Sequence, residues 1–460
     1  MAKPVKPSPV VVVIGAGPAG TRTAERLVAA GLRPVVVDEG RRGGGQIYRR
    51  QPDGFRRPAT DLYGFEAGKA TALHRDFDAL AGRIDYRPET LAWHLQDGAV
   101  HLARDGRSTA VRYDALVLAT GATDRVMPVP GWTRPGVFGL GGAQIALKAQ
   151  ACAIGGRVVF LGTGPLLYLV AYQYAKAGAL VEAVLDTSPW SRRLAAMPAL
   201  AARPAMLAKG MYYAGWLAAR RVPVLTGVTP LGIDGDAHVT GVRILDSAGR
   251  ARRFDGDAVG LGFGLRSETQ LADLARCRFA FDPLARQWLP ETDPDGRTST
   301  PGVYLAGDGA RILGADAAEV SGRLAACAVL RDLGRPVADG EIDGLRRAGR
   351  AMQRFRHGLE TAFPWPVRLA AGLPDDTVVC RCEAVTAGEL RRTASELGAP
   401  EVNRAKAFSR VGMGRCQGRY CGLAGAEVLA AALGVPVESV GRQRGQGPVK
   451  PLPTTTEFAS

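Results

Sequence analysis

Four of the seven cysteines lie close together near the end of the 460-residue chain, at a spacing that suits a metal centre. They form a Cys-x-Cys pair, Cys380 and Cys382, and after a gap of 33 residues a Cys-x4-Cys pair, Cys416 and Cys421. Four thiolates bind iron–sulfur clusters and zinc well. Because zinc sites mostly place their cysteines two to four residues apart, the Cys-x-Cys pair favours iron, and structural zinc stays the alternative.

Three glycines near the N-terminus form a second motif with chemical potential. Gly15-x-Gly17-x-x-Gly20 follows an apolar run typical of a buried strand and opens an expected helix. Gly15 can make the tight turn, Gly17 can let backbone N–H groups approach a pyrophosphate, and Gly20 can allow the helix to pack closely on the strand. Asp38, eighteen positions after Gly20, can accept hydrogen bonds from a ribose diol, with Glu39 as a second candidate. The pattern predicts a bound dinucleotide but does not distinguish FAD from NAD.

A second copy of this pattern begins after residue 156. Gly162 and Gly164 supply its first two glycines, but Leu167 stands where the third glycine belongs. A leucine there keeps helix and strand further apart and weakens the case for a nicotinamide cofactor. Asp186 ends the following strand and is the candidate ribose acceptor of this unit. The pattern predicts a second Rossmann-type domain and leaves open whether it binds an adenine nucleotide, NAD(P) or neither.

Two further turns, Thr120–Gly121 and Gly307–Asp308, each follow a buried strand. At these residues the chain resembles the two-dinucleotide-domain flavoproteins of the pyridine nucleotide-disulfide oxidoreductase superfamily. The resemblance implies that the first unit binds FAD, with Gly307 and Asp308 at the ribityl chain and phosphates and Thr120 and Gly121 in the same site. It also implies that the next helix points its N-terminus at the flavin, where partial positive charge would stabilise negative charge.

The string GGQIYR at residues 44–49 narrows the resemblance to the flavoprotein subunits of D-hydroxyproline dehydrogenase, opine oxidase and hydrogen cyanide synthase complexes. In that comparison Gly45 and Gln46 belong to the FAD site. The region around the four cysteines similarly resembles the bacterioferritin-associated-ferredoxin-like [2Fe-2S] domain, and Lys406 and Arg410 match its pattern. The resemblance implies a [2Fe-2S] cluster held by all four cysteines.

The expected fold class is α/β, with two Rossmann-like domains of the glutathione-reductase type and a small, mainly helical [2Fe-2S] domain. The FAD domain is expected to be split by the second Rossmann-like domain. The expected boundaries are 9–150 and 266–345 for the two parts of the FAD domain, 151–265 for the second Rossmann-like domain, 346–376 for a linker, 377–441 for the [2Fe-2S] domain and 442–460 for an extended tail.

The resemblance implies an FAD-dependent oxidoreductase that works as an electron-transfer subunit of a dye-linked amino- or imino-acid dehydrogenase. A partner flavoprotein would oxidise the substrate, of the hydroxyproline, opine or glycine type, and a quinone or other acceptor would take the electrons. A small ferredoxin-like subunit is a further candidate partner. No histidine constellation supplies a general base, so no catalytic residue is assigned. The alternatives are a self-sufficient NAD(P)H-dependent oxidoreductase and a redox-inert structural subunit.

The net charge of +15 comes from scattered basic residues. No aromatic-lined binding module accompanies them, which excludes nucleic acid as an expected partner. Five basic residues flank the cysteines, and we expect them to raise the potential of the cluster or to meet an acidic face of the partner subunit. They are Arg381, Lys406, Arg410, Arg415 and Arg419.

The expected location is the cytoplasm. An odd number of cysteines, four of them clustered, argues against a secreted disulfide framework. The first apolar stretch, Val10–Ile14, is too short for a signal peptide, and no stretch is long and apolar enough to span a bilayer. Any membrane association would then be peripheral, at the inner face, through the electron acceptor.

Overall fold

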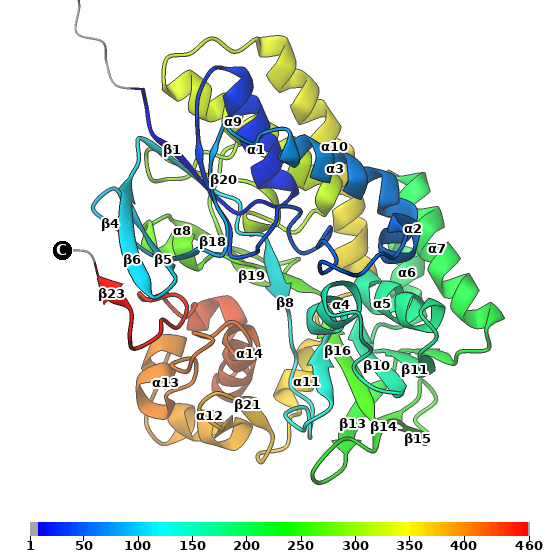
Figure 1. The fold of residues 1–460 in the computed structure, drawn as a ribbon. Coiled ribbons are helices and arrows are strands. Elements are labelled where there is room, and N and C mark those ends of the chain that lie inside the picture. The colour runs from blue at the N-terminus through cyan, green and yellow to red at the C-terminus, as the bar shows by residue number, and fades with distance from the viewer. Residues whose placement is uncertain (1–7, 459–460) are drawn as a thin grey trace, which may run out of the picture.

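The computed structural model describes residues 8–458, and a five-stranded parallel sheet lies at the centre of its first domain (Figure 1). The strand order is β20–β7–β1–β2–β3. Four of these strands are built from Val, Ile, Leu, Ala and Tyr and are fully buried, as a parallel sheet covered on both faces requires. The bounds are β1 Val11–Ile14, β2 Val35–Val37, β3 Asp85–Arg87, β7 Ala115–Leu118 and β20 Val303–Leu305.

Two helices from distant parts of the chain pack together on this sheet. α1 (Pro18–Ala29) begins at the glycine turn, and α9 (Ala315–Asp332) follows β20. Their contact is very close, because a Cβ at Gly322 of α9 would lie 2.2 Å from the carbonyl oxygen of Ala19. The other elements of this domain are α2 Ala59–Tyr63, η1 Gly64–Glu66, α3 Ala67–Asp78, and a flap of β4 Leu91–Gln96, β5 Ala99–Arg104 and β6 Arg107–Arg112.

A second parallel sheet, in the order β12–β11–β10–β16–β9, interrupts the first domain. α5 (Pro165–Lys176) starts at its glycine turn, and an antiparallel sheet of β13, β14 and β15 extends it. The bounds are β9 Val137–Gly139, α4 Leu140–Ala149, β10 Arg157–Thr163, β11 Leu180–Asp186, α6 Trp190–Leu200, α7 Pro204–Ala219, β12 Val224–Thr226, β13 Thr229–Asp234, β14 Gly241–Leu245, β15 Ala251–Asp255 and β16 Ala258–Phe263.

The chain enters and leaves the second domain on two short strands that pair with each other. β8 (Ala122–Asp124) leads out of the first sheet, and β17 (Leu265–Ser267) returns antiparallel to it. α8 (Gln270–Leu274), β18 (Phe279–Asp282) and β19 (Gln287–Pro290) then lead back to β20. The first domain is therefore assembled from two segments on either side of the second.

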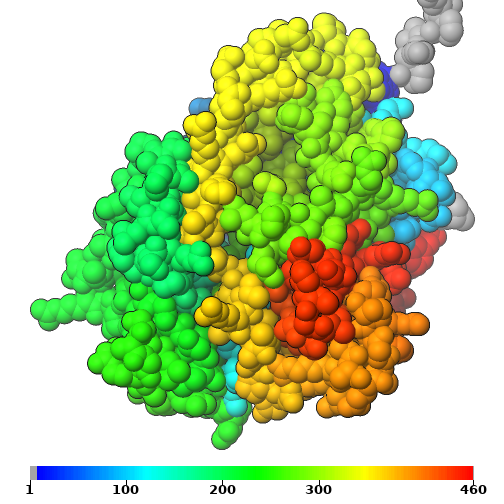
Figure 2. Space-filling model, turned by 180° about the vertical axis from the view of Figure 1, so that it is seen from behind, coloured from blue at the N-terminus to red at the C-terminus, as the bar shows by residue number. Residues whose placement is uncertain are grey.

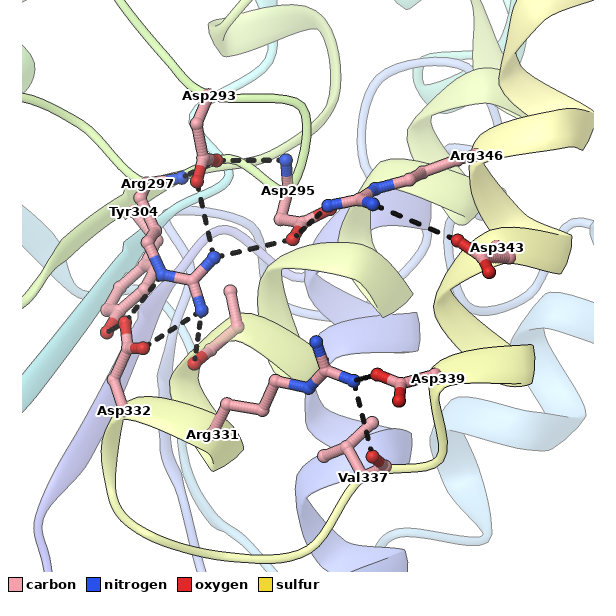
Figure 3. Close-up of polar contacts among 11 residues, drawn as sticks. Asp293, Asp295, Arg297, Tyr304, Arg331, Asp332, Val337, Asp339, Asp343 and Arg346 are labelled. Atoms are coloured by element: carbon pink, nitrogen blue, oxygen red, sulfur yellow. Dashed lines mark hydrogen bonds and ion pairs between the residues drawn. The ribbon is translucent and has the colours of Figure 1, made fainter.

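A network of ion pairs fixes the ends of α9 and α10 to the first domain (Figure 3). Arg297 donates from Nε and Nη2 to the two oxygens of Asp332 at 2.8 and 2.9 Å, and Tyr304 of β20 donates to the same carboxylate at 2.6 Å. Arg346 of α10 (Asp339–Ala362) donates to both oxygens of the buried Asp295 at 2.8 Å. α10 runs across residue 346, the expected boundary between the FAD domain and the linker.

The cysteine-bearing segment forms a small, mainly helical domain that packs against residues 265–290 (Figure 2, orange to red). The tail after Gly441 returns to the first domain, where Val449 donates its N–H to the carbonyl of Trp93 and β23 pairs with β6. The bounds are α11 Val367–Ala371, β21 Val378–Cys380, β22 Val385–Thr386, α12 Ala387–Ser395, α13 Val402–Ser409, α14 Gly422–Leu433, η3 Val437–Val440 and β23 Glu457–Phe458.

Candidate functional site

The glycine turn between β1 and α1 has no room for side chains at two of its positions. A Cβ at Gly15 would lie 2.3 Å from the carbonyl oxygen of Ala119, and a Cβ at Gly20 would lie 1.8 Å from the carbonyl oxygen of Gly15. Gly15 also has a φ of +107°, which side chains rarely adopt. Both glycines are therefore explained by the packing of the protein itself.

Gly17 is different, because protein packing does not demand a glycine there. A Cβ at Gly17 would meet only the Cα of Gly45, at an ordinary 3.6 Å. Gly45 belongs to the loop that follows β2, and the preceding Gly44 donates its N–H to the carbonyl of Ala16 at 2.8 Å. A bare backbone facing a second bare backbone at the start of α1 suits a pyrophosphate, which needs close access to N–H groups.

Asp38 lies at the end of β2 and points back at this turn. Its two oxygens accept hydrogen bonds from the N–H groups of Ala16, at 2.5 Å, and Gly40, at 2.6 Å. Burial raises the pKa of Asp38 despite these bonds. Glu39 points elsewhere and forms an ion pair with Lys450 of the tail, so the two acidic candidates have separate surroundings.

The turns after β7 and β20 meet beside the same helix. A Cβ at Gly307 would lie 2.8 Å from the Cβ of Ala19, and one at Gly309 would lie 2.6 Å from Oγ1 of Thr120. Asp308 between them accepts the N–H groups of Leu313 and Gly314 through a single oxygen, Oδ1, at 2.9 and 3.0 Å. Its other oxygen accepts no hydrogen bond from the part of the chain that the structure describes. Burial raises the pKa of Asp308.

The structure thus brings most of the sequence-predicted residues of the first unit to one edge of the first sheet. They are Gly15, Gly17, Gly20, Asp38, Gly45, Thr120, Gly121, Gly307 and Asp308. Gln46 is exposed and its side-chain oxygen accepts a hydrogen bond from Arg49 at 2.6 Å. FAD requires carboxylates that accept hydrogen bonds from its hydroxyl groups and backbone N–H groups that donate to its phosphates. This edge of the sheet offers both.

The four predicted cysteines come together in the small domain. Their thiols contact one another in a row, Cys380 to Cys421, Cys421 to Cys416 and Cys416 to Cys382. Cys380 and Cys421 are buried, while Cys382 and Cys416 are partly exposed. Within residues 8–458 no three His, Cys, Asp or Glu side chains are placed to hold a single ion. Four neighbouring thiols of this kind can supply the four thiolate ligands of a [2Fe-2S] cluster.

Two of the four thiols, those of Cys416 and Cys380, favour ionisation, whereas burial raises the pKa of Cys382. The pKa of Cys416 falls to about 5 because Cys421 donates its thiol hydrogen to it, and backbone N–H groups of Tyr420 and Gly418 add to the effect. The pKa of Cys380 falls to about 6, again chiefly because of Cys421. The pKa of Cys421, which supplies these hydrogens, is raised. Thiolates stabilised by N–H groups are the form that binds iron.

Three glycines in the loop that carries Cys416 allow close contacts with Cys382 and with Gln443 of the tail. A Cβ at Gly414 would lie 2.2 Å from the Cβ of Cys382. Cβ atoms at Gly412 and Gly418 would each lie 2.2 Å from Oε1 of Gln443, which the tail inserts between them. The side chain of Gln443 is held there by a hydrogen bond from its Nε2 to the carbonyl of Val411 at 3.2 Å.

The two centres are joined by the segment that follows β17. The backbone of Glu268 forms two hydrogen bonds with the turn after β7. Its carbonyl accepts a hydrogen bond from Oγ1 of Thr120 at 2.6 Å, and the N–H of Glu268 donates to the carbonyl of Gly121 at 3.0 Å. The carboxylate of Glu268 accepts from Arg419 at 2.6 and 3.2 Å, and Arg419 also donates to the carbonyl of Cys416 at 3.3 Å. A continuous set of hydrogen bonds therefore links the predicted flavin turn to the cysteine loop.

Two neighbours of Glu268 hold the same loop. Arg266 donates from Nη1 to the carbonyls of Gly418 and Arg419, at 3.3 and 3.0 Å. Gln270 donates from Nε2 to the carbonyl of Gln417 at 2.6 Å. Arg266, Glu268 and Gln270 therefore all form hydrogen bonds with residues that lie between Cys416 and Cys421.

The structure changes the interpretation of Arg419. The sequence suggested a cation that tunes the cluster or meets a partner, yet the Arg419 side chain is only 10% exposed and paired with Glu268. Of the other basic residues near the cysteines, Arg415 and Arg410 are exposed, and Arg381 lies over the ring of Tyr420. Sequence reasoning missed Glu268 and Gln443, because neither belongs to a local motif.

The candidate nucleotide residues of the second unit are arranged differently. Asp186 is completely buried, and its carboxylate accepts hydrogen bonds from Tyr168 at 2.8 Å, Ser188 at 2.8 Å and Arg193 at 2.6 Å. A Cβ at Gly162 would lie 1.7 Å from the carbonyl oxygen of Gly262, and a Cβ at Gly164 would lie 3.8 Å from the Cα of Gly264. Leu167 is fully buried in the core of this domain. Asp186 therefore already has protein donors where a ribose would otherwise bind.

Comparison with known proteins agrees with this arrangement. Residues 9–329 match the family model of the pyridine nucleotide-disulphide oxidoreductases. The chain belongs to this family. Residues 378–431 match the BFD-like [2Fe-2S] binding domain. This pyridine nucleotide-disulphide oxidoreductase is thus an FAD-dependent enzyme with a [2Fe-2S] cluster, which confirms the cofactors and the fold class expected from the sequence.

Several curated proteins are similar to this oxidoreductase over nearly its full length. An opine oxidase subunit of Agrobacterium tumefaciens (strain Ach5) is 40% identical over 96% of this chain and 90% of its own. The HcnB protein of hydrogen cyanide synthase from Pseudomonas aeruginosa is 34% identical over 96% of this chain and 97% of its own. The crystal structure of L-proline dehydrogenase from P. horikoshii shares the fold, with a TM-score of 0.69 and 18% identity over 97% of this chain and 79% of that one.

No helix between residues 8 and 458 is long and apolar enough to cross a membrane.

Proposed function

We propose that this chain is the electron-transfer subunit of a multi-subunit, dye-linked amino- or imino-acid dehydrogenase. Relatives named as subunits of opine oxidase and hydrogen cyanide synthase support this, since they match over nearly the full length. The substrate is of the opine, hydroxyproline or glycine type, and a partner flavoprotein oxidises it. A quinone or another acceptor takes the electrons, and the enzyme works in the cytoplasm.

The observation that carries the proposal is the set of hydrogen bonds from residues 266–270 to the loop between Cys416 and Cys421. FAD can exchange one or two electrons and a [2Fe-2S] cluster exchanges one, so together they convert two-electron into one-electron chemistry. The chain contributes positioning: Thr120 and Gly121 hold the backbone of Glu268, and Glu268 holds Arg419 beside Cys416. A fixed link between two redox centres supports transfer between them.

The residues we assign to the FAD site have distinct tasks. Gly15, Gly17 and Gly20 shape the turn for the pyrophosphate, and Asp38 accepts the ribose hydroxyl groups. Asp308 accepts from the ribityl chain through its free oxygen. Gly45 leaves the approach to Gly17 open. We assign the cluster to the four cysteines, with backbone N–H groups around Cys380 and Cys416 as hydrogen-bond donors to sulfur.

A self-sufficient NAD(P)H-dependent reductase has less support. Its nicotinamide cofactor would need a ribose acceptor in the second unit, and Asp186 is buried beneath Tyr168 and Arg193. We therefore expect NADH and NADPH to leave the flavin oxidised.

The proposal is tested by purifying the chain alone and together with its partner subunits from the native host. Anaerobic dye reduction is then measured with an opine, hydroxyproline, glycine, NADH and NADPH as donors. We expect turnover only in the assembled complex and only with one of the amino or imino acids. Dye reduction by the isolated chain with NADH or NADPH would contradict the proposal.

A further inference from the structure

Arg266 is a cation that contacts the cysteine loop directly. It belongs to β17, the strand on which the chain returns from the second domain to the first. Its Nη1 donates to the carbonyls of Gly418 and Arg419, at 3.3 and 3.0 Å. Both carbonyls lie in the loop between Cys416 and Cys421. The guanidinium of Arg266 is therefore next to the position that we assign to the cluster.

The charge of Arg266 is not neutralised by an ion pair. Within residues 8–458 no carboxylate forms a salt bridge with its guanidinium, whose Nη1 is bonded to backbone carbonyls. Glu268, two positions further along, uses both of its oxygens to pair with Arg419. That pair has no net charge, so Arg266 adds one uncompensated positive charge to this side of the loop.

Arg266 also lies where bulk water screens its charge poorly. It is half-buried and lines a cavity of about 80 Å³ between β19 and α14. Burial lowers the pKa of Arg266, while the charges of Glu268, Cys421 and Cys416 act in the opposite direction. A guanidinium nevertheless stays protonated at neutral pH. The cysteine loop thus has a permanent positive charge on its inner side.

The basic residues that the sequence singled out act under different conditions. Arg415 and Arg410 are exposed to solvent, where water and salt screen a charge within about 10 Å. Arg419 is buried, but Glu268 neutralises it. Arg266 was not among the expected residues, because it lies 150 positions before Cys416 and belongs to no cysteine motif.

A positive charge in this place has a defined effect on a [2Fe-2S] cluster. Four thiolates and two sulfides outweigh the charge of two irons, so the cluster is net negative and gains one further negative charge on reduction. A nearby cation stabilises the reduced form more than the oxidised form, and this raises the reduction potential. We propose that Arg266 raises the potential of the cluster and thereby favours the transfer of one electron to it from the reduced flavin. This inference rests on the assignment of the cluster to the four cysteines.

The reduction potential of the cluster in the holoprotein tests the role of Arg266. It is measured by anaerobic redox titration, with the electron paramagnetic resonance signal of the reduced cluster as the readout. Arg266→Met removes the charge, and at a fixed potential the ratio of reduced to oxidised cluster should fall about tenfold. For a one-electron couple this is a decrease of about 59 mV. Arg266→Lys keeps the charge and should restore most of the wild-type potential.

Arg415→Met is the matched control, because it removes a positive charge from the same loop at an exposed position. Its potential should stay close to that of wild type, and any small shift should disappear at high ionic strength. The decrease in Arg266→Met should persist there, because salt does not replace a shielded cation. A purely structural role of Arg266 would not distinguish its methionine variant from its lysine variant in this way.

Iron and acid-labile sulfide are measured first, because Arg266 also holds the loop through two hydrogen bonds. If Arg266→Met lacks the cluster, the neutral variant Arg266→Gln, which can still donate an N–H, takes its place. An unchanged potential in the neutral variant, or an equal decrease in Arg266→Lys, would overturn the proposal. So would loss of the cluster in all three variants, which would make Arg266 a residue that only holds the loop. A cluster retained by Cys416→Ser would instead contradict the ligand assignment.

Discussion

Glu268 and Arg419 form a buried ion pair between the first domain and the cysteine loop. Arg419 donates from Nε to Oε2 of Glu268 at 2.6 Å and from Nη2 to Oε1 at 3.2 Å, and each side chain is 10% exposed. Burial alone would raise the pKa of Glu268, but the charge and hydrogen bonds of Arg419 outweigh it and hold that pKa below its ordinary value. The pair fixes the cysteine loop against the turn formed by Thr120 and Gly121.

Replacing one member of this pair should loosen the cysteine domain. Arg419→Met leaves the Glu268 carboxylate buried without its cation, which costs about 3–5 kcal/mol. We expect the cluster absorbance to be lost at a lower temperature, and the double variant Glu268→Met with Arg419→Met to recover most of the difference. Arg415→Met, in the same loop but exposed, is the control and should match wild type. Equal melting of Arg419→Met and Arg415→Met would show that the pair does not hold the domain.

Gly17→Val should remove FAD while leaving the fold intact. The structure offers space for a Cβ at Gly17, so the new side chain fills the pyrophosphate position instead of disrupting α1. The flavin-to-protein ratio should fall to near zero with cluster absorbance retained. Gly164→Val is the comparison: its φ of +108° makes a side chain strained, so stability should drop while flavin content stays. Retention of flavin by Gly17→Val would refute our FAD assignment.

Cys416→Ser should remove the cluster and spare the flavin. The ligands of the two centres lie on different domains, and a thiolate is replaced by a weaker ligand for iron. Iron and acid-labile sulfide analysis, together with flavin content, gives the result. Loss of both cofactors would mean that the cysteine domain and the FAD domain do not fold independently.

The buried charge of Lys148 in α4 should lower the free energy of unfolding at neutral pH, compared with an uncharged side chain at the same position. Lys148 is 4% exposed and donates to the carbonyl of Ile47 at 3.3 Å, and burial, with some help from Lys209, lowers its pKa from 10.5 to about 8. Between these values the unfolded chain binds more protons, so stability rises as the pH increases from about 8 to 10.5. Lys148→Met should stabilise the protein at pH 7, by up to about 3 kcal/mol, and abolish this rise.

Unfolding should be followed for wild type and Lys148→Met in parallel at pH 7 and pH 10. The stability difference between the two proteins is the quantity of interest, because it removes the contribution of other titrating groups. A destabilised Lys148→Met at pH 7 would contradict the interpretation and indicate that the buried charge is compensated.

The features predictable from the sequence were those encoded within short segments. The glycine turn at residues 15–20, Asp38 and the two cysteine pairs each carry their chemistry in local spacing. The fold class, and the cofactors that the family resemblance implied, are confirmed. A turn needs particular backbone angles and a cluster needs particular ligands. Both requirements restrict residue types at fixed positions.

Contacts between distant segments could not be predicted in the same way. Glu268 and Arg419 are 151 positions apart, and only the folded chain brings them together. Asp186 has the position of a ribose acceptor in its motif, yet its Oδ2 atom accepts hydrogen bonds from Tyr168 and Arg193 and its Oδ1 atom accepts one from the N–H of Ser188. The ion pair between Arg346 of α10 and Asp295 is another contact between distant segments that no local pattern encodes.

The central claim, that electrons pass between flavin and cluster within one chain, is tested most directly by a time-resolved reduction. The flavin of the purified holoprotein is reduced by a light pulse under anaerobic conditions, and the absorbance of the cluster is followed at several protein concentrations. We predict that the cluster becomes reduced as the flavin is reoxidised, at a rate that does not change with protein concentration. A cluster that stays oxidised, or a rate proportional to protein concentration, would contradict the account.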